Sequence, residues 1–153
     1  MKKILISSCL LGQPVRYDGQ SKPLIHSVID HWQSEGRLIS ICPEVAGGLP
    51  IPRPPAELNQ SLQKVLTEDG IDVTPQFIRG AELALALCNK HNIGYALLKE
   101  SSPSCGSHKV YDGSFTNQKI NGQGITAKLL SEYGVSVYSE DTIAQLVSEI
   151  ARQ

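Results

Sequence analysis

Three of the chain's four cysteines follow apolar runs that are predicted to be buried strands. Cys9 and Cys42 come immediately after the first and the second run, and Cys105 lies a few residues past the third. The carboxyl ends of parallel strands meet at one edge of a sheet, and ligands bind in the crevice beyond that edge. The sequence therefore predicts three thiols at one sheet edge, where they could share a metal ion or an iron–sulfur cluster.

The cysteine spacing alone does not choose between several kinds of site. Three thiolates suit a cubane of four irons, in which one iron lacks a protein ligand and is an open Lewis acid. His108 could instead complete a closed zinc site with three cysteines, and either this zinc site or an iron–sulfur cluster could belong to a non-enzymatic binding module. Cys105 and His108 could also act without metal, as a nucleophile and its base. Cys88 occupies an apolar position of a predicted helix and is expected to pack in the core.

Charged residues lie close to these cysteines in the sequence. Glu44 is two residues from Cys42, and a partly desolvated carboxylate there could act as a general acid and base. Arg16 and Arg53 lie in the loops after the first two strands. They could orient carbonyl groups of a substrate or offset the negative charge of the thiolates, and we leave both interpretations open. Lys99 is a weaker candidate for the same role.

The elements that would position these residues alternate between strand and helix. Short apolar runs predict strands over 3–8, 37–41, 94–99 and 135–138, and helical spacing predicts helices over 24–32, 74–90, 125–133 and from about 141 onward. Thr74 is the expected N-cap of the second helix, with Pro75 at its first position. This alternation predicts a single three-layer α/β domain over 1–153, Rossmann-like, with a mostly parallel sheet.

The connections between these elements include two expected hairpins. Asp69-Gly70 predicts a hairpin over 64–73, and Asp112-Gly113 predicts a short one in the loop after the third strand. Segment 42–57 is too rich in proline and glycine for regular structure. Gly122-Gln123-Gly124 is expected to be a helix-start turn rather than a phosphate loop.

The composition is that of an ordinary soluble protein. The 153 residues are 41% hydrophobic and 19% charged, with a net charge of -1. This charge disfavours a nucleic-acid partner, and no apolar run is long enough for a membrane span. The apolar run after Met1-Lys2-Lys3 is too short for a signal peptide. We therefore expect a cytoplasmic protein that acts on a small molecule, with free cysteines rather than disulfides.

Three segments resemble the thiouracil desulfidase family, once known only as a domain of unknown function. They are CLLGQPVRYDG (9–19), ISICPEVAGGLPIPRPPAE (39–57) and LLKESSPSCGS (97–107). The similarity extends over the whole chain, and the middle segment is long and unusual in composition. The chain is similar to the short, stand-alone form of the family.

The resemblance implies an α/β domain whose [4Fe-4S] cluster is held by Cys9, Cys42 and Cys105. It further implies that the fourth iron binds the sulfur removed from a base such as 2- or 4-thiouracil. Because the thiocarbonyl sulfur is a soft ligand and no electron has to move, we expect this iron to act as a Lewis acid without electron transfer. Glu44 and a serine before the last cysteine would carry the reaction. We assign that serine as Ser102, and expect Ser104 to bind substrate together with Arg16 and Arg53.

Overall fold

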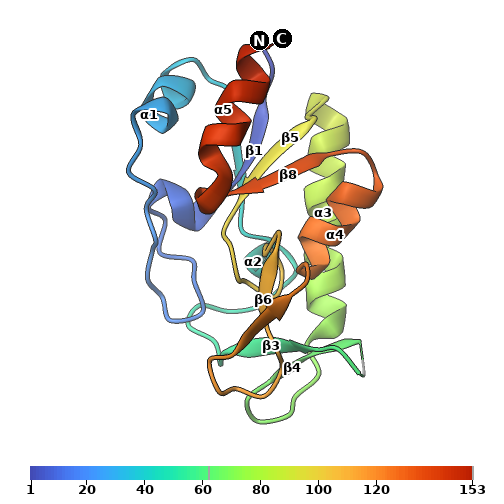
Figure 1. Cartoon of the computed structure of the whole chain (residues 1–153). Coiled ribbons are helices and arrows are strands. Elements are labelled where there is room, and N and C mark those ends of the chain that lie inside the picture. The colour runs from blue at the N-terminus through green and yellow to red at the C-terminus, as the bar shows by residue number, and fades with distance from the viewer. Residues whose placement is uncertain (62, 153) are drawn as a thin grey trace.

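A parallel four-stranded sheet forms the centre of the protein (Figure 1). The structure is a computed structural model that describes residues 1–61 and 63–152. The strands lie in the order β2-β1-β5-β8, and every neighbouring pair is parallel. Their bounds are β1 Ile4–Ser7, β2 Leu38–Ile41, β5 Tyr95–Leu98 and β8 Ser136–Ser139. The four predicted strands and the α/β fold class are confirmed.

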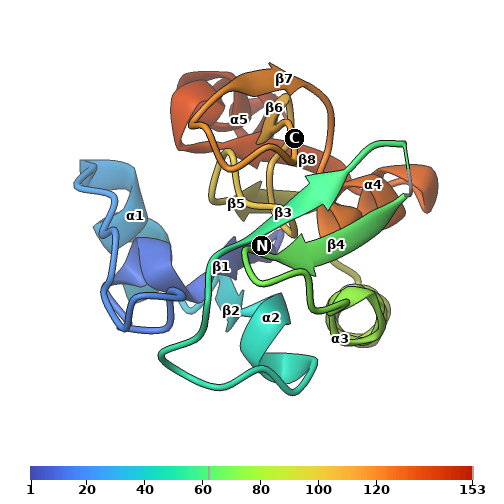
Figure 2. The same cartoon turned by 90° about the horizontal axis from the view of Figure 1, so that it is seen from below.

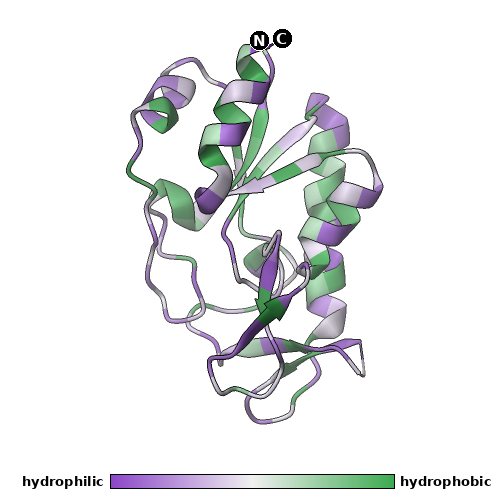
Figure 3. Cartoon of the chain, in the orientation of Figure 1, coloured by the Kyte–Doolittle hydropathy of each residue, from purple (hydrophilic) through white to green (hydrophobic). Residues whose placement is uncertain are grey.

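Two helices cover each face of the sheet, which gives the three layers (Figure 1). The alternation of side chains along a strand sends Ile4 and Ile6 to one face and Leu5 to the other. The first face packs against α1 (Ser27–Ser34) and α5 (Ile143–Ala151), and the second against α3 (Thr74–His91) and α4 (Ile125–Glu132). Figure 3 shows hydrophobic residues along β1 and along α3 and α5. No described helix is long and apolar enough to span a bilayer.

The start of α3 differs from the prediction. Val73, not Thr74, occupies the N-cap position, and the helix already includes Thr74. The Thr74 hydroxyl accepts a hydrogen bond from the Val65 backbone N–H at 2.9 Å, so it joins the helix to the neighbouring strand instead of capping the helix. The amide of Thr74 is bound by the Asp72 carboxylate at 2.9 Å.

The hairpin expected over 64–73 is only partly present. Strand β4 (Lys64–Thr67) pairs antiparallel with β3 (Ala56–Asn59), and a single bridge joins Leu66 to Asp72. The pairing of β4 with β3 was not predicted because the prolines before Ala56 argue against a strand there. Strand β3 forms nevertheless, and its Leu58 is buried with Val65 and Phe77. The hairpin expected around Asp112-Gly113 is confirmed as β6 (Lys109–Tyr111) and β7 (Lys119–Asn121). Figure 2 shows both hairpins on the side of the molecule that faces the carboxyl ends of the strands.

A short helix, α2 (Pro43–Ala46), follows β2 within the segment expected to be irregular. It packs on α3 through two glycines. A Cβ atom at Gly80 would lie 1.9 Å from the Pro43 carbonyl oxygen, and one at Gly47 would lie 2.0 Å from the Gln76 carbonyl oxygen. The two backbones therefore touch directly, which fixes the residues at the start of α2 relative to the core.

Candidate active site

The three cysteines expected at the sheet edge line one cavity of about 250 Å³. Cys9 lies in the 3-10 turn after β1, Cys42 is the residue before α2, and Cys105 lies in the loop after β5. Since β2, β1 and β5 are adjacent, three consecutive strand ends each contribute one thiol. Cys88 lies elsewhere, 2% exposed in the core on α3, as predicted.

The surroundings of the thiols make them costly to ionise without a cation. Burial and the nearby Cys42 raise the pKa of Cys9 to about 11, although the charges of Lys99 and Arg16 act in the opposite direction. Burial likewise raises the pKa of Cys42, against hydrogen bonds from backbone amides of α2, and the pKa of Cys105 is raised by burial most of all. Thiolate ligands lose their protons when they bind metal, so a metal centre would offset this cost.

The donor set fits a cluster better than a single ion. In the described part of the chain, no three His, Cys, Asp or Glu side chains lie close enough together to coordinate one metal ion. His108, the fourth ligand of the zinc alternative, is instead engaged by its neighbours: its Nδ1 lies 2.9 Å from the Ser107 hydroxyl and 3.5 Å from Glu100 Oε2. Three soft thiols that line one cavity are a ligand set typical of iron–sulfur clusters.

Glu44 lines the same cavity and is held at both carboxylate oxygens. Arg53 Nε donates to Oε1 at 3.2 Å, and the Ser102 hydroxyl donates to Oε2 at 3.4 Å. Burial raises the pKa of Glu44, and the contacts with Arg53 and Ser102 offset only part of that effect. The protonated form of this carboxyl is therefore more accessible than that of a solvent-exposed glutamate.

The two serines of the last segment occupy different environments. The Ser102 hydroxyl lines the cavity and accepts hydrogen bonds from the backbone amides of Ser104 and Cys105, at 3.0 and 3.1 Å. The Ser104 side chain is fully buried, and its hydroxyl lies 2.7 Å from that of Thr126 on α4. The structure thus brings Ser102 together with Glu44 but does not bring the Ser104 side chain to the cavity, because that hydroxyl ties the loop to α4.

The two arginines also differ. Arg53 donates to the Pro50 and Val15 carbonyls at 3.1 and 3.0 Å as well as to Glu44, so all three guanidinium nitrogens have protein partners. This geometry makes Arg53 a support for Glu44. Arg16 lies at the cavity wall, with its guanidinium 3.9 Å from Asp18 and over the ring of Tyr17.

Lys99, the weaker candidate, lines the cavity but is already paired. Its Nζ lies 2.8 Å from Glu140 Oε2 and donates to the Glu100 carbonyl at 3.0 Å. Its positive charge acts on Cys9. Its ammonium group already has two partners in the protein, Glu140 and the Glu100 carbonyl.

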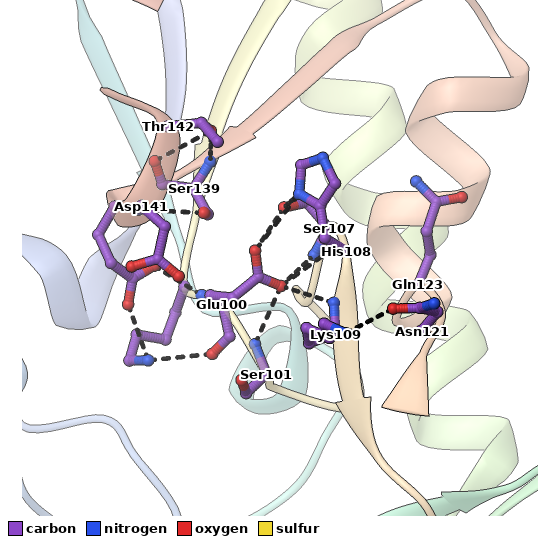
Figure 4. A network of polar contacts seen from close by, with 12 residues as sticks. Glu100, Ser101, Ser107, His108, Lys109, Asn121, Gln123, Ser139, Asp141 and Thr142 are labelled. Atoms are coloured by element: carbon purple, nitrogen blue, oxygen red, sulfur yellow. Dashed lines mark hydrogen bonds and ion pairs between the residues drawn. The ribbon is translucent and has the colours of Figure 1, made fainter. Parts of the chain in front are cut away.

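Glu100 is a functional residue that the sequence reasoning missed (Figure 4). Its Oε1 accepts from the backbone amides of Ser101, Ser107, His108 and Lys109, at 2.8 to 3.3 Å, and its Oε2 accepts from the Ser107 hydroxyl at 2.8 Å. Burial alone would raise the pKa of Glu100, but these hydrogen bonds lower it to about 2. One ionised carboxylate thus closes the loop that carries Cys105. A glutamate directly after a buried strand and before a loop of small residues was the available signal.

Hairpin β6–β7 completes the wall with Tyr111 and Asn117. Glu57 on β3 binds the loop of this hairpin, accepting from the amides of Gly113 and Phe115 at 3.0 and 3.2 Å. Glu57 therefore fixes the loop of this hairpin through hydrogen bonds.

A family of known proteins matches most of this chain. The family model described as 2-thiouracil desulfurase matches residues 4–142. The chain belongs to this family. A desulfurase-family structure named "[4Fe-4S]-dependent thiouracil desulfidase TudS (DUF523Vcz)" is 52% identical, with a TM-score of 0.97 and coverage of 100% of both chains.

A second relative is a curated protein of Bacillus subtilis (strain 168) named "Uncharacterized protein YbbK". It is 38% identical over 154 residues, which cover 94% of this chain and 99% of that protein. The match spans nearly the full length of both sequences.

Proposed function

We propose that this protein is a [4Fe-4S]-dependent desulfidase that converts a thiolated pyrimidine, such as 2- or 4-thiouracil, to the corresponding oxo base and sulfide. Cys9, Cys42 and Cys105 would hold the cluster, Glu44 would act as general acid and base, and Ser102 would assist it. The observation that carries the proposal is one cavity lined by three thiols together with the Glu44–Ser102 pair. Membership of the desulfurase family and the likeness to the desulfidase structure support the same assignment.

The cluster would supply an open iron, a Lewis acid for the soft thiocarbonyl sulfur that makes the ring carbon electrophilic. The remaining steps belong to this chain's own residues. Glu44 takes a proton from water as the water oxygen bonds to the ring carbon. The C–S bond then breaks while the new hydroxyl loses its proton and becomes a carbonyl. This proton and the proton held by Glu44 pass to the sulfur, which leaves as hydrogen sulfide, and Glu44 returns to its ionised form. The sum is thiouracil plus water giving uracil plus hydrogen sulfide, with no net oxidation.

Ser102 and Arg53 would prepare Glu44 for these proton transfers. Ser102 accepts from two backbone amides, so its own proton is directed at Glu44 Oε2. Arg53 holds the other oxygen and is itself buried among loop carbonyls. Arg16, at the wall beside Tyr17, is the basic side chain better placed to meet a substrate carbonyl or the cluster's charge.

The direct test is oxygen-free purification followed by iron and sulfide analysis and an assay with 2- and 4-thiouracil. We expect about four irons per chain, as a cubane requires, and release of sulfide with formation of uracil. Protein that holds the cluster but releases no sulfide from either base would contradict the desulfidase. Protein that binds zinc instead of iron would contradict the cluster. The cytoplasmic location remains a prediction.

A further inference from the structure

Hairpin β6–β7 contributes to the cavity wall but carries none of the groups used in the proposed reaction. Its residues Tyr111 and Asn117 line the same cavity as the three thiols and Glu44. A wall residue opposite a reactive centre is where an enzyme can select its substrate, since differential contacts there decide which molecule reacts.

The loop that presents Asn117 is held in place by two kinds of contact with β3. The Glu57 carboxylate binds the amides of Gly113 and Phe115 at 3.0 and 3.2 Å. Gly113 also packs tightly on β3, since a Cβ atom there would lie 3.1 Å from the Leu58 carbonyl oxygen. Asn117 itself has a φ of 62°, a left-handed conformation that asparagine tolerates better than most residues. The position of Asn117 is therefore set by the fold.

Asn117 differs chemically from the other polar groups of the wall. Glu44 and Ser102 are bonded to each other, Arg53 uses its nitrogens within the protein, and Lys99 is paired with Glu140. Among the described residues that line the cavity, Asn117 is the one carboxamide, and no described residue hydrogen-bonds to its side chain. A carboxamide offers a donor and an acceptor side by side.

We propose that Asn117 recognises the N–H and carbonyl edge of the substrate ring and so selects cyclic thio-imides. This inference rests on the proposed function. In 2- and in 4-thiouracil the ring nitrogen N3 carries a proton and lies between the thiocarbonyl and the remaining carbonyl. With the sulfur directed at the thiols, Asn117 Oδ1 would accept from N3–H and Nδ2 would donate to the carbonyl. The same pair of contacts would serve either thiouracil isomer and would be lost with an N3-alkylated base.

The test compares 4-thiouracil with 3-methyl-4-thiouracil, and uracil with 3-methyluracil, on the cluster-loaded wild type and on Asn117→Ala. Sulfide release gives the apparent kcat/KM of the thio-bases, and calorimetry gives the affinity of the sulfur-free bases. We expect the wild type to prefer the unmethylated base about tenfold, the worth of one or two neutral hydrogen bonds. Asn117→Ala should lower the affinity and the apparent kcat/KM for the unmethylated base about tenfold. It should also remove most of the preference for the unmethylated over the methylated base. Asn121→Ala is the control, because Asn121 lies on the same hairpin, where its side chain pairs with Lys109.

The outcomes separate this inference from the function on which it rests. If thiouracil is desulfurised but Asn117→Ala keeps the wild-type affinity for the unmethylated base, the inference is wrong and the desulfidase stands. If no sulfide is released but uracil binds and its preference over 3-methyluracil depends on Asn117, the inference stands without that reaction. A wild type that binds neither uracil nor thiouracil overturns the inference. Glu57→Gln, which weakens the support of the loop, should shift the preference in the same direction as Asn117→Ala.

Discussion

The Ser102 hydroxyl lies 3.4 Å from Glu44 Oε2 and so links the loop after β5 to the helix after β2 across the cavity. The two residues are 58 positions apart in the sequence. The same hydroxyl accepts from the amide of Cys105, and Glu44 lies two residues from Cys42. Two hydrogen bonds of Ser102 and the short backbone segment from Cys42 to Glu44 thus join the proposed proton-transfer group to two of the three candidate ligands, so their geometries depend on one another.

Glu44→Gln should keep the cluster and lose the reaction. Glutamine can still accept from Arg53 through its carbonyl oxygen, but its amide nitrogen cannot accept from Ser102. It also does not take up a proton, and general base catalysis contributes roughly 10²- to 10⁴-fold. We expect sulfide release to fall at least about 100-fold while iron content and the visible spectrum stay at wild-type values. Glu68→Gln, at an exposed carboxylate after β4, is the control. Full activity of Glu44→Gln would remove Glu44 from the mechanism.

Replacement of single cysteines by serine should distinguish ligands from core residues. Cys9→Ser, Cys42→Ser and Cys105→Ser each remove a soft donor from the cavity, so iron content and activity should be lost together. Cys88→Ser is the matched variant, because Cys88 lies in the core on α3 and does not line the cavity. It should be somewhat less stable but retain iron. Loss of iron in Cys88→Ser alone would reverse the assignment.

Glu100→Gln should lower stability in a pH-dependent way. The pKa of Glu100 is lowered to about 2 in the folded state, so its ionised form stabilises the fold above the unfolded-state pKa, and this stabilisation is lost as pH falls toward 2. This pKa shift corresponds to a contribution of at most about 3 kcal/mol to the free energy of unfolding near neutral pH. Urea unfolding of cluster-free protein gives the free energy of unfolding of wild type and variant. The difference between the two should become smaller by about 1 kcal/mol from neutral pH to about pH 3.5. A difference in the free energy of unfolding that does not change with pH would show that the negative charge of Glu100 does not account for the stabilisation.

Gly80→Ala should disturb the site from a distance. The added methyl group would collide with the Pro43 carbonyl, next to Cys42, and overpacking of this kind costs about 1–3 kcal/mol. We expect a lower free energy of unfolding and weaker retention of iron, measured by denaturation and by the rate of iron loss to a chelator. Gly94→Ala is the control, because no atom lies within 4 Å of a Cβ placed there. Wild-type behaviour of Gly80→Ala would show that α2 can move without affecting the site.

The sequence predicted the sheet and the meeting of the cysteines because both follow from local patterns. Buried parallel strands are continuous apolar runs, and a cysteine directly after such a run must lie at the carboxyl edge of the sheet. Glu44 was found by the same proximity. These inferences needed no knowledge of how distant loops pack.

The features that sequence reasoning missed depend on tertiary contacts. Strand β3 follows prolines that argue against a strand, and it is stabilised by the burial of Leu58 against Val65 and Phe77. Glu100 gains its role from amides up to nine residues away, which only the closed loop brings together. Ser104 could not be separated from Ser102 by spacing, since the contact with Thr126 that turns it inward comes from α4.

Because β1 is bonded to β2 on one side and to β5 on the other, the three thiols reach a common place only when all three strands have joined. No fragment of the chain that lacks one of these strands would contain the site. The polypeptide segments that bring the thiols together are thus the strands at the centre of the sheet, and any substitution that separates β1 from β2 or from β5 should also separate the thiols.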